Sequence, residues 1–400
     1  MAKPPQRKQS IAGHFEPYAG DAVVVLDEII RIAVSTNASD IHLEPKARHL
    51  QVRLRLDGEM VEQRPIDAAI AAQVISRVKV LSRMDIAERR LPQDGQLAID
   101  AGDGTVHMRA STFPCSQGEK VVLRLLMGQA LYAFDKLGMD EKQQERVREM
   151  VTRPQGFIIT CGPTGSGKTS TLYSFLQLIE TSRVNVVTLE DPIEVELPAI
   201  TQGQANVRTG FTFAAGLRAI LRQDPDVILV GEIRDAETAG IALQAALTGH
   251  LVMSTLHTGD TVETVVRLVD LGIESWIIAN ALSAVIAQRL VRRVCAQCAT
   301  MTQLEMDFWD GDELLLPRGA GIVRPTGCPA CLRTGYRGRT GIFEVLAIDD
   351  ELRELIKAKS AAREYRDALQ QRRIVSLRRA GFEKVVAGMT TVDEVVRVTT

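Results

Sequence analysis

The 400-residue sequence lacks several features that would assign it to a special class of protein. It has no apolar run close to the ~20 residues that a membrane-spanning helix needs. The segment Met1–Ser10 is polar and basic, and no apolar stretch follows it that would make a secretory signal. The chain also has no internal repeat at solenoid periods and no low-complexity segment. These absences predict a globular chain in the cytoplasm.

Neither sign of charge dominates, because 48 Lys and Arg stand against 50 Asp and Glu, for a net charge of −2. This balance argues against bulk binding of nucleic acid, although it allows a local basic patch. The chain has only six cysteines, and in a cytoplasmic protein these are more often metal ligands or buried thiols than disulfides. The length, with 45% hydrophobic and 24% charged residues, predicts two or three domains.

The apolar patterns predict an α+β domain followed by an α/β domain. In the second, the apolar runs 184–189, 227–230 and 251–255 alternate with helical stretches, which predicts a parallel sheet covered on both faces. After Thr264 we expect helix through Leu290. The predicted divisions are a flexible tail (1–20), the α+β domain (21–128), a linker (129–140), the α/β domain (141–290), a cysteine module (291–345) and a helical C-terminal region (346–400).

Gly162–Thr169 matches the phosphate-binding P-loop pattern, Gly-x-x-x-x-Gly-Lys-Ser/Thr. A strand-like run precedes it and a helix-like run follows it, and this context argues against a chance match. Glycines let the backbone N–H groups turn toward phosphate oxygens, and the helix N-terminus adds partial positive charge. We expect Lys168 to reach the β- and γ-phosphates of ATP and the Thr169 hydroxyl to hold Mg²⁺. The predicted nucleotide-binding residues of the loop are Gly162, Pro163, Thr164, Gly165, Ser166, Gly167, Lys168 and Thr169.

Three further polar clusters follow predicted strands, at the sheet edge where open α/β folds bind ligands. Glu190–Glu194 offers carboxylates that could bind Mg²⁺ through water or orient an attacking water, unless it is only a solvated acidic loop. Asp226–Glu232 resembles a Walker B strand, but Gly231 occupies the usual place of the acid. The pattern therefore leaves open which carboxylate contacts the metal. His257 suits a sensor of the γ-phosphate, with a structural histidine as the alternative.

Two basic regions are also candidates for contact with phosphate. Arg109 and Arg124 lie on predicted strands of the first domain, and arginine binds phosphate in a forked geometry. They would act as arginine fingers if this domain lay over a neighbouring subunit's nucleotide, and surface charge is the alternative. Arg353–Arg379 holds nine Lys and Arg against three Asp and Glu. That segment suits a phosphate-binding, membrane-proximal or subunit-interface surface, or a solvated helix.

Four of the six cysteines form two Cys-x-x-Cys pairs separated by 29 residues. Two such pairs can close a tetrahedral Zn²⁺ site, and a site with four protein ligands is structural rather than catalytic. A redox dithiol is the alternative. We expect Cys115 and Cys161 to be plain buried thiols. The predicted zinc ligands are Cys295, Cys298, Cys328 and Cys331.

Together these motifs resemble the secretion and pilus-assembly ATPases, that is, the type II secretion ATPase and the type IV pilus extension ATPase. The resemblance covers residues 21 to 400 and includes the family's own form of the Walker B segment. It rests on Ala38–Pro45, Arg90–Gly95, Gly162–Thr169, Thr188–Glu194, Leu221–Asp226, Gly231–Asp235, Thr248–Thr258 and Gly388–Thr391.

The resemblance implies a homohexameric Mg²⁺-ATPase with a PAS-like α+β domain and a RecA-like α/β domain in each subunit. Nucleotide would lie between the two domains. Glu232 would be the Walker B acid and is our first choice for catalysis, with Glu190 and Glu194 as rivals. The arginines that would close on the phosphates are Arg109 and Arg124 from the first domain and Arg218, Arg222 and Arg234 from the second.

The resemblance also implies a motor that powers pseudopilus or pilus assembly through ATP-driven domain closure. Its partners would be inner-membrane platform proteins, with acidic lipid as a further candidate, and it would lie peripherally on the cytoplasmic face of that membrane. Such proteins usually carry a further N-terminal docking domain, whereas only about 20 residues precede the match here. The four cysteines favour assembly or secretion over retraction. A nucleic-acid-translocating RecA-like ATPase and a catalytically idle scaffold subunit are the alternatives.

Overall fold

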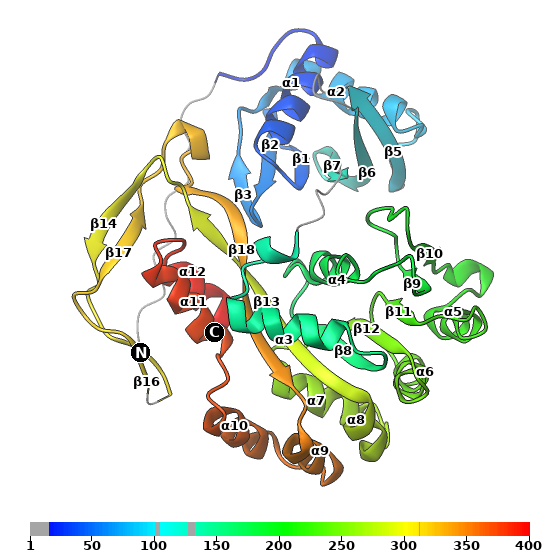
Figure 1. Cartoon of the computed structure of the whole chain (residues 1–400). Coiled ribbons are helices and arrows are strands. Elements are labelled where there is room, and N and C mark those ends of the chain that lie inside the picture. The colour runs from blue at the N-terminus through cyan, green and yellow to red at the C-terminus, as the bar shows by residue number, and fades with distance from the viewer. Residues whose placement is uncertain (1–15, 101–104, 127–132, 312) are drawn as a thin grey trace. The chain divides into compact units, whose positions relative to one another are not determined.

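The computed structural model describes residues 16–100, 105–126, 133–311 and 313–400 (Figure 1). The chain divides into two compact units, residues 1–129 and 130–400, which we call the N-terminal and C-terminal units. Most of the predicted tail and residues 129–132 of the predicted linker lie outside the described residues. Within the described ranges, no helix combines the length and apolar character that crossing a membrane requires.

The N-terminal unit is an antiparallel sheet packed on two helices. Its strands neighbour one another in the order β3–β2–β1–β7–β6–β5, and β4 pairs with β2. Buried leucine and valine alternate along β2 with half-buried arginine and glutamine, so one sheet face is apolar and the other is charged. The elements are α1 (Ala22–Ser35), β1 (Asp40–Pro45), β2 (His49–Leu56), β3 (Glu59–Glu62), β4 (Ile66–Asp67), α2 (Ala68–Leu81), β5 (Gln93–Asp100), β6 (Thr105–Cys115) and β7 (Gly118–Leu126).

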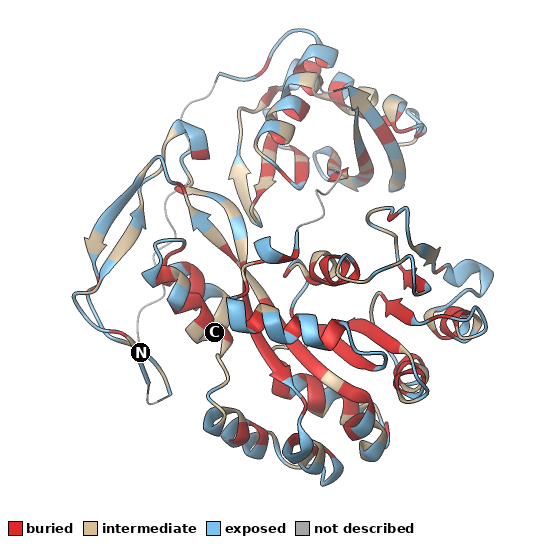
Figure 2. Cartoon of the chain, in the orientation of Figure 1, coloured by how far each residue is buried: buried red, intermediate tan, exposed pale blue. Residues whose placement is uncertain are grey.

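The C-terminal unit is built on a seven-stranded sheet whose middle strands are buried almost throughout (Figure 2). The first part of this unit comprises α3 (Glu141–Val151), β8 (Gly156–Cys161), α4 (Lys168–Leu176), β9 (Val186–Glu190), β10 (Thr201–Gln204), α5 (Phe213–Ile220), β11 (Val227–Val230), α6 (Ala236–Leu247), β12 (Leu251–Leu256), α7 (Thr261–Asp270), α8 (Ser275–Ala281) and β13 (Leu282–Val294). The remainder comprises β14 (Ala299–Gln303), β15 (Phe308–Asp310), β16 (Glu313–Leu316), β17 (Gly321–Pro325), β18 (Tyr336–Ala347), α9 (Asp350–Lys357), α10 (Ala362–Gln371), α11 (Leu377–Val386) and α12 (Val392–Thr399).

The strand order in this sheet is β10–β9–β11–β12–β8–β13–β18. The strands from β10 to β13 are parallel, and β18 runs antiparallel to β13. Successive residues of β8 face opposite sides, since Ile158 joins a cluster with α3 and α4, whereas Phe157 and Ile159 join a larger cluster with α5 to α12. The predicted parallel sheet with helices on both faces is confirmed.

One predicted element is wrong, because Leu282–Leu290 belongs to a strand and not to a helix. Within the predicted helical stretch from Thr264 to Leu290, the residues up to Asp270 belong to α7 and Ser275–Ala281 forms α8. The apolar run Leu282–Ala287 is almost wholly buried and lies between β8 and β18. A segment buried on both faces shows no two-residue alternation, so its sequence cannot distinguish strand from helix.

The expectation for the two remaining cysteines is half correct. Cys161, at the end of β8, is a buried thiol, and burial raises its pKa to about 11. Cys115, at the end of β6, is exposed. Cys115 lies beside the turn that joins β6 to β7, and this position exposes it to solvent. The residue type alone predicts burial, because a free cysteine behaves as a small apolar side chain.

A buried carboxylate on the C-terminal helix α12 forms hydrogen bonds that join this helix to β13. Glu394 is only 2% exposed and accepts hydrogen bonds from Arg292 on β13 and from Arg397 one helical turn away. Burial alone would raise the pKa of Glu394, but these guanidinium groups outweigh it and lower the pKa to about 2. The carboxylate therefore stabilises the folded state at pH values above about 4.5, the pKa in the unfolded chain. That stabilisation is lost as the pH falls toward 2.

Replacing Glu394 with glutamine should lower the free energy of unfolding at pH 7 by about 2 kcal/mol, because two charge-assisted hydrogen bonds are weakened. Urea denaturation at several pH values measures the effect, and the difference from wild type should shrink below pH 4.5. Asp393→Asn is the control, since Asp393 is its exposed neighbour on α12. Equal stability of the Glu394→Gln variant and wild type at pH 7 would contradict this account.

Candidate functional site

The loop Gly162–Gly167 joins the buried strand β8 to helix α4. Gly162, Gly165 and Gly167 have φ values of +150°, +79° and +88°, which residues with a side chain rarely adopt. A Cβ atom on Gly162 would lie 2.6 Å from the backbone oxygen of Gln288. Both the backbone conformation and the close packing therefore require glycine in this loop.

Lys168 is the first residue of α4 and folds back over the loop. Its Nζ donates hydrogen bonds to the carbonyl oxygens of Gly162 at 2.7 Å and Pro163 at 3.0 Å. Burial lowers the pKa of Lys168, and the negative charge of Glu232 opposes that effect. The ammonium group is thus held at the loop by neutral oxygens, which a phosphate group could replace as a stronger partner. Thr169 follows it in the first turn of the helix, half-buried.

Glu232 lies two residues beyond β11, and two other predicted residues lie beside its carboxylate. Arg234 donates a hydrogen bond to one carboxylate oxygen, and His257 Nε2, beyond the end of neighbouring β12, lies 3.4 Å from the other. A Cβ atom on Gly231 would lie 3.3 Å from the backbone oxygen of Leu189 on β9, which is a tight contact. Glycine therefore lets β11 pass close to the end of β9, and the acid follows one residue later.

Glu190 is bound differently from Glu232. It is 3% exposed and accepts hydrogen bonds from the hydroxyl of Tyr173, from Thr188 at 2.5 Å and from the amide of Gln202 at 3.1 Å. Burial raises the pKa of Tyr173, and the neighbouring carboxylate raises it further. Because three donors occupy its oxygens, Glu190 links α4, β9 and β10. Glu194 lies exposed in the segment after β9.

The other predicted arginines of the C-terminal unit lie on its surface. Arg218 forms a salt bridge of 2.8 Å with Glu237, and both side chains are more than half exposed. Arg222 lies just beyond α5 and donates to the carbonyl oxygen of Arg218 at 2.7 Å. Of the three predicted arginines in this unit, Arg234 is the one that the structure joins to Glu232.

In the N-terminal unit, Arg109 on β6 lies directly opposite Arg124 on β7. Two arginines in register repel each other unless an anion lies beside them. The Nε of Arg124 is 3.0 Å from Asp40 on β1, and the same carboxylate is 3.6 Å from Arg55 on β2. The Nε of Arg109 is buried and has no hydrogen-bond partner among the residues that the structure describes. Asp40 is a part of this group that the sequence did not single out.

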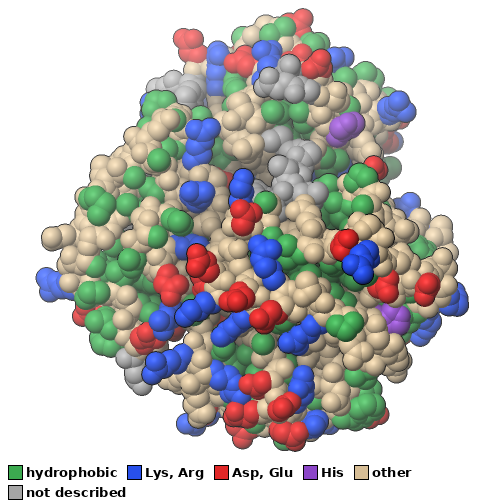
Figure 3. Space-filling view, in the orientation of Figure 1, with side chains coloured by type: hydrophobic (Ala, Val, Ile, Leu, Met, Phe, Trp, Pro, Cys, Tyr) green, Lys and Arg blue, Asp and Glu red, His purple; other side chains and the backbone are tan. Residues whose placement is uncertain are grey.

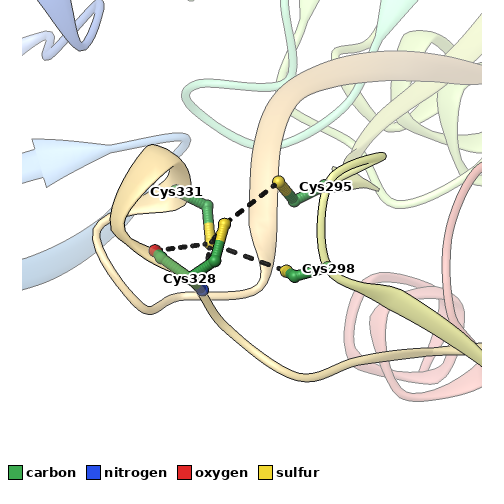
Figure 4. Close-up of side chains that lie close together, drawn as sticks. All are labelled: Cys295, Cys298, Cys328 and Cys331. Atoms are coloured by element: carbon green, nitrogen blue, oxygen red, sulfur yellow. Dashed lines mark hydrogen bonds between the residues drawn. The ribbon is translucent and has the colours of Figure 1, made fainter.

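The four predicted metal ligands converge on one point (Figure 4). The Sγ atoms are 4.0 Å apart for Cys295 and Cys328, 3.9 Å for Cys298 and Cys331, and 3.8 Å for Cys328 and Cys331. Four sulfurs at 2.3 Å from a tetrahedral Zn²⁺ would lie about 3.8 Å from one another. The backbone N–H groups of Cys328 and Gly335 donate to the sulfur of Cys331, as expected around a thiolate.

The strands that follow Cys298 hold the two cysteine pairs together. Strand β14 pairs with β17, and β15 pairs with β16, so residues 299–311 and 313–325 form a separate excursion that returns to Cys328. Cys295 comes directly after β13, and its backbone N–H donates to the carbonyl oxygen of Gly335. The donor set and its spacing fit zinc.

Sequence reasoning missed several polar side chains that contact the predicted residues. These contacts join residues that are between 12 and 122 positions apart, and the local sequence carries no signal of them. Tyr173 and Gln288 stand in stretches that the sequence predicts as helix, and Gln202 stands in a segment without a recognised pattern. The missed residues are Asp40, Tyr173, Gln202 and Gln288.

Residues 19–397 match the family model described as "Type II/IV secretion system protein". The chain is 44% identical over 376 residues to "Type II secretion system protein HxcR" of Pseudomonas aeruginosa, covering 94% of this chain and 76% of that protein. It is 44% identical over 378 residues to "Type II secretion system ATPase E" of Vibrio cholerae, covering 94% and 75%.

A solved structure titled as the pilus retraction motor PilT with bound ADP has a similar fold. It superposes with a TM-score of 0.61 at 26% sequence identity, over 93% of this chain and 96% of that one. The architecture described above is therefore similar to that of this pilus retraction motor along most of both chains.

Proposed function

The chain belongs to the type II/IV secretion system protein family, and from this premise we propose that it is an ATP-hydrolysing motor that powers the assembly of a pseudopilus or pilus. One observation carries the proposal: the P-loop and the group formed by Glu232, Arg234 and His257 follow the carboxyl ends of β8, β11 and β12, which lie side by side in one parallel sheet. A nucleotide there would meet phosphate-binding amides on one side and an acid on the other.

Each residue of the loop has a proposed part in binding Mg²⁺-ATP. The loop amides and Lys168 hold the phosphates, and the ammonium group exchanges its carbonyl partners for phosphate oxygens. The Thr169 hydroxyl binds Mg²⁺, and Glu232 assists it. Arg218, Arg222 and Arg234 are the proposed cations that close on the phosphates in the assembled protein.

We assign the orientation of the attacking water to Glu232 rather than to its rivals. Glu190 already accepts three hydrogen bonds within the protein, so it has little capacity left for water. Glu194 is exposed and lies in a segment without regular structure. Glu232 has His257 beside it, and that proximity supports the proposal that the histidine reports on the γ-phosphate.

Replacing Glu232 with glutamine should reduce ATP turnover at least about 100-fold while changing the affinity for ATP only severalfold, since the amide cannot accept a proton. Phosphate release gives the rate, and equilibrium binding of a fluorescent ATP analogue gives the affinity. Glu145→Gln on the exposed face of α3 is the matched control. Full turnover in the Glu232→Gln variant would reject this role. Absence of ATPase activity in the wild-type ring would favour an idle scaffold.

The proposal extends to a homohexameric ring in which the N-terminal units have a PAS-like fold and the P-loop units a RecA-like fold. Arg109 and Arg124 would then contact nucleotide held by the second unit of their own or a neighbouring chain. Arg124 uses its Nε for Asp40 and is mostly exposed, so its terminal N–H groups are the donors that would meet a phosphate. We also propose the domain limits given above, a structural zinc held by the four cysteines, and docking to platform proteins or acidic lipid at the cytoplasmic face of the inner membrane.

The alternative of a nucleic-acid motor finds little support in the basic segment Arg353–Arg379. Six of its nine cations lie within salt-bridge distance of a carboxylate, and on the face drawn in Figure 3 acidic and basic side chains are intermingled. Charges neutralised in this way bind phosphate weakly. The six are Arg353, Lys357, Arg363, Arg366, Arg372 and Arg379. Stimulation of ATPase activity by DNA with a steep salt dependence would nonetheless favour this alternative.

A further inference from the structure

Gln288, a glutamine on β13, packs against the P-loop. Strand β13 runs parallel to β8, with Ala287 opposite Cys161, the last residue of β8 (Figure 1). Beyond that point β8 gives way to the loop, whereas β13 continues for seven more residues. Gln288 is therefore the first residue of β13 to lie beside the loop rather than beside a strand, and it is 2% exposed.

The side-chain amide of Gln288 bonds both to the loop and to the helix that follows it. Its Nε2 donates to the carbonyl oxygen of Ser166 at 2.8 Å, and its Oε1 accepts from the hydroxyl of Thr171 at 2.7 Å. The orientation of the amide is unambiguous, because a carbonyl oxygen can only accept a hydrogen bond. Both polar ends of a buried side chain are thus used by the phosphate-binding element.

The glycines of the loop pack on the same residue. A Cβ atom on Gly167 would lie 2.9 Å from Nε2 of Gln288, and one on Gly162 would lie 2.6 Å from its backbone oxygen. Each contact is too close for any residue with a side chain. The first and last glycines of the loop therefore both rest on Gln288, which limits how far either end can move.

The bond to Ser166 also orients an amide. The carbonyl of Ser166 and the N–H of Gly167 belong to one planar trans peptide, so they point in opposite directions. Holding the carbonyl toward β13 turns the N–H of Gly167 away from β13. On the proposed function, on which this step rests, that N–H is one of the donors that hold phosphate.

We propose that Gln288 is a positioning residue of the nucleotide site, which fixes the loop in its phosphate-binding shape before a nucleotide arrives. Its contribution is preorganisation, because the loop amides then need no reordering when they meet phosphate. Neither the P-loop motif nor the acidic clusters contain this residue, which lies 122 positions from Ser166 in the sequence.

The test replaces Gln288 with glutamate, which keeps the shape and exchanges one donor for a titrating acceptor. At pH 8 the carboxylate would face the carbonyl oxygen of Ser166, and ATP affinity should fall at least about tenfold. Burial raises the pKa of such a carboxyl group. Toward pH 5.5 the protonated acid can donate to Ser166 again, and affinity relative to wild type should recover severalfold.

Gln288→Leu separates this effect from titration elsewhere in the site. The charged or titrating groups on the surrounding elements are Lys168 on α4, Arg289 on β13, Glu344 on β18 and Cys161 on β8, and they are the same in both variants. The leucine variant should bind ATP at least about tenfold more weakly at every pH and show no recovery. Thr171→Val, which removes the other partner, should weaken binding severalfold.

Binding of a fluorescent ATP analogue to the full chain, with thermal unfolding of each variant, distinguishes the outcomes. Gln244→Glu, exposed on α6, controls for the added charge. If both the glutamate and the leucine variants bind ATP with wild-type affinity, the proposal is wrong. It is also wrong if Thr171→Val lowers the melting temperature but leaves ATP affinity unchanged. Failure of the wild-type chain to bind ATP would instead refute the proposed function.

Discussion

The Lys168→Ala variant should lose ATP turnover by at least about 100-fold and bind ATP weakly, yet remain folded. A donor aimed at charge that develops in the transition state contributes on this scale when it is held in a site of low polarity. Lys168 meets that condition, because its side chain is buried and its Nζ is fixed by the carbonyl oxygens of Gly162 and Pro163. Alanine removes the only ammonium group of the P-loop motif.

The fold should survive this change, because Lys168 bonds only to its own loop in the described contacts. The expected shift of the melting temperature is a few degrees, as for the loss of about 1 kcal/mol. Phosphate release and thermal unfolding measure the two effects separately. Lys142→Ala, on the exposed surface of α3, is the matched control. Turnover at the wild-type rate in Lys168→Ala would remove the basis of the proposed function.

The parts of the site that the sequence could predict are those that a short segment encodes by itself. The P-loop is recognisable because its glycines must adopt positive φ within six residues of the lysine. The place of Glu232 was harder, since the acid stands one residue later than in the usual Walker B pattern. Gly231 occupies the usual place of the acid and packs closely against the backbone oxygen of Leu189 on the neighbouring strand, a contact that no local pattern reveals.

Partners that are far apart in sequence could not be predicted. Gln288 binds Ser166 only because β13 lies beside β8, and that segment was expected to be helical. An apolar run buried on both faces has no period that reveals its conformation. Asp40 and Arg124, 84 positions apart, become neighbours through the pairing of β1 with β7. The residues around each partner do not indicate which distant strand will pair with it.

Removal of zinc should destabilise the C-terminal unit more than any single substitution at the surface. The binding energy of a structural zinc is folding energy, because the unfolded chain has no preformed site. Here the cluster closes a loop from Cys295 to Cys331 and joins the end of β13 to the segment before β18. Without the ion, four thiols would converge with only weak hydrogen bonds between them.

We expect about one zinc per chain, measured by mass spectrometry of the intact protein or by a chromogenic chelator. Cys298→Ser should lose the metal, since serine is a poor ligand for Zn²⁺ at neutral pH. Cys298 is a suitable position because it is only half-buried, so the loss of packing is small. The melting temperature should fall by several degrees or more, and a chelator should lower that of wild type to a similar value.

The chelator also separates metal binding from the redox alternative. It should have little further effect on Cys298→Ser, whereas a reductant alone should leave wild type unchanged, because the sulfurs lie 3.8 to 4.0 Å apart and form no disulfide. Cys115→Ser is the matched control, since Cys115 is exposed and lies in the N-terminal unit. If the purified wild-type protein contains no metal, and added zinc does not raise its melting temperature, the four cysteines serve another purpose. Because Cys295 directly follows the strand that carries Gln288, a metal-free chain that keeps its ATP affinity would further show that the P-loop does not depend on the cluster.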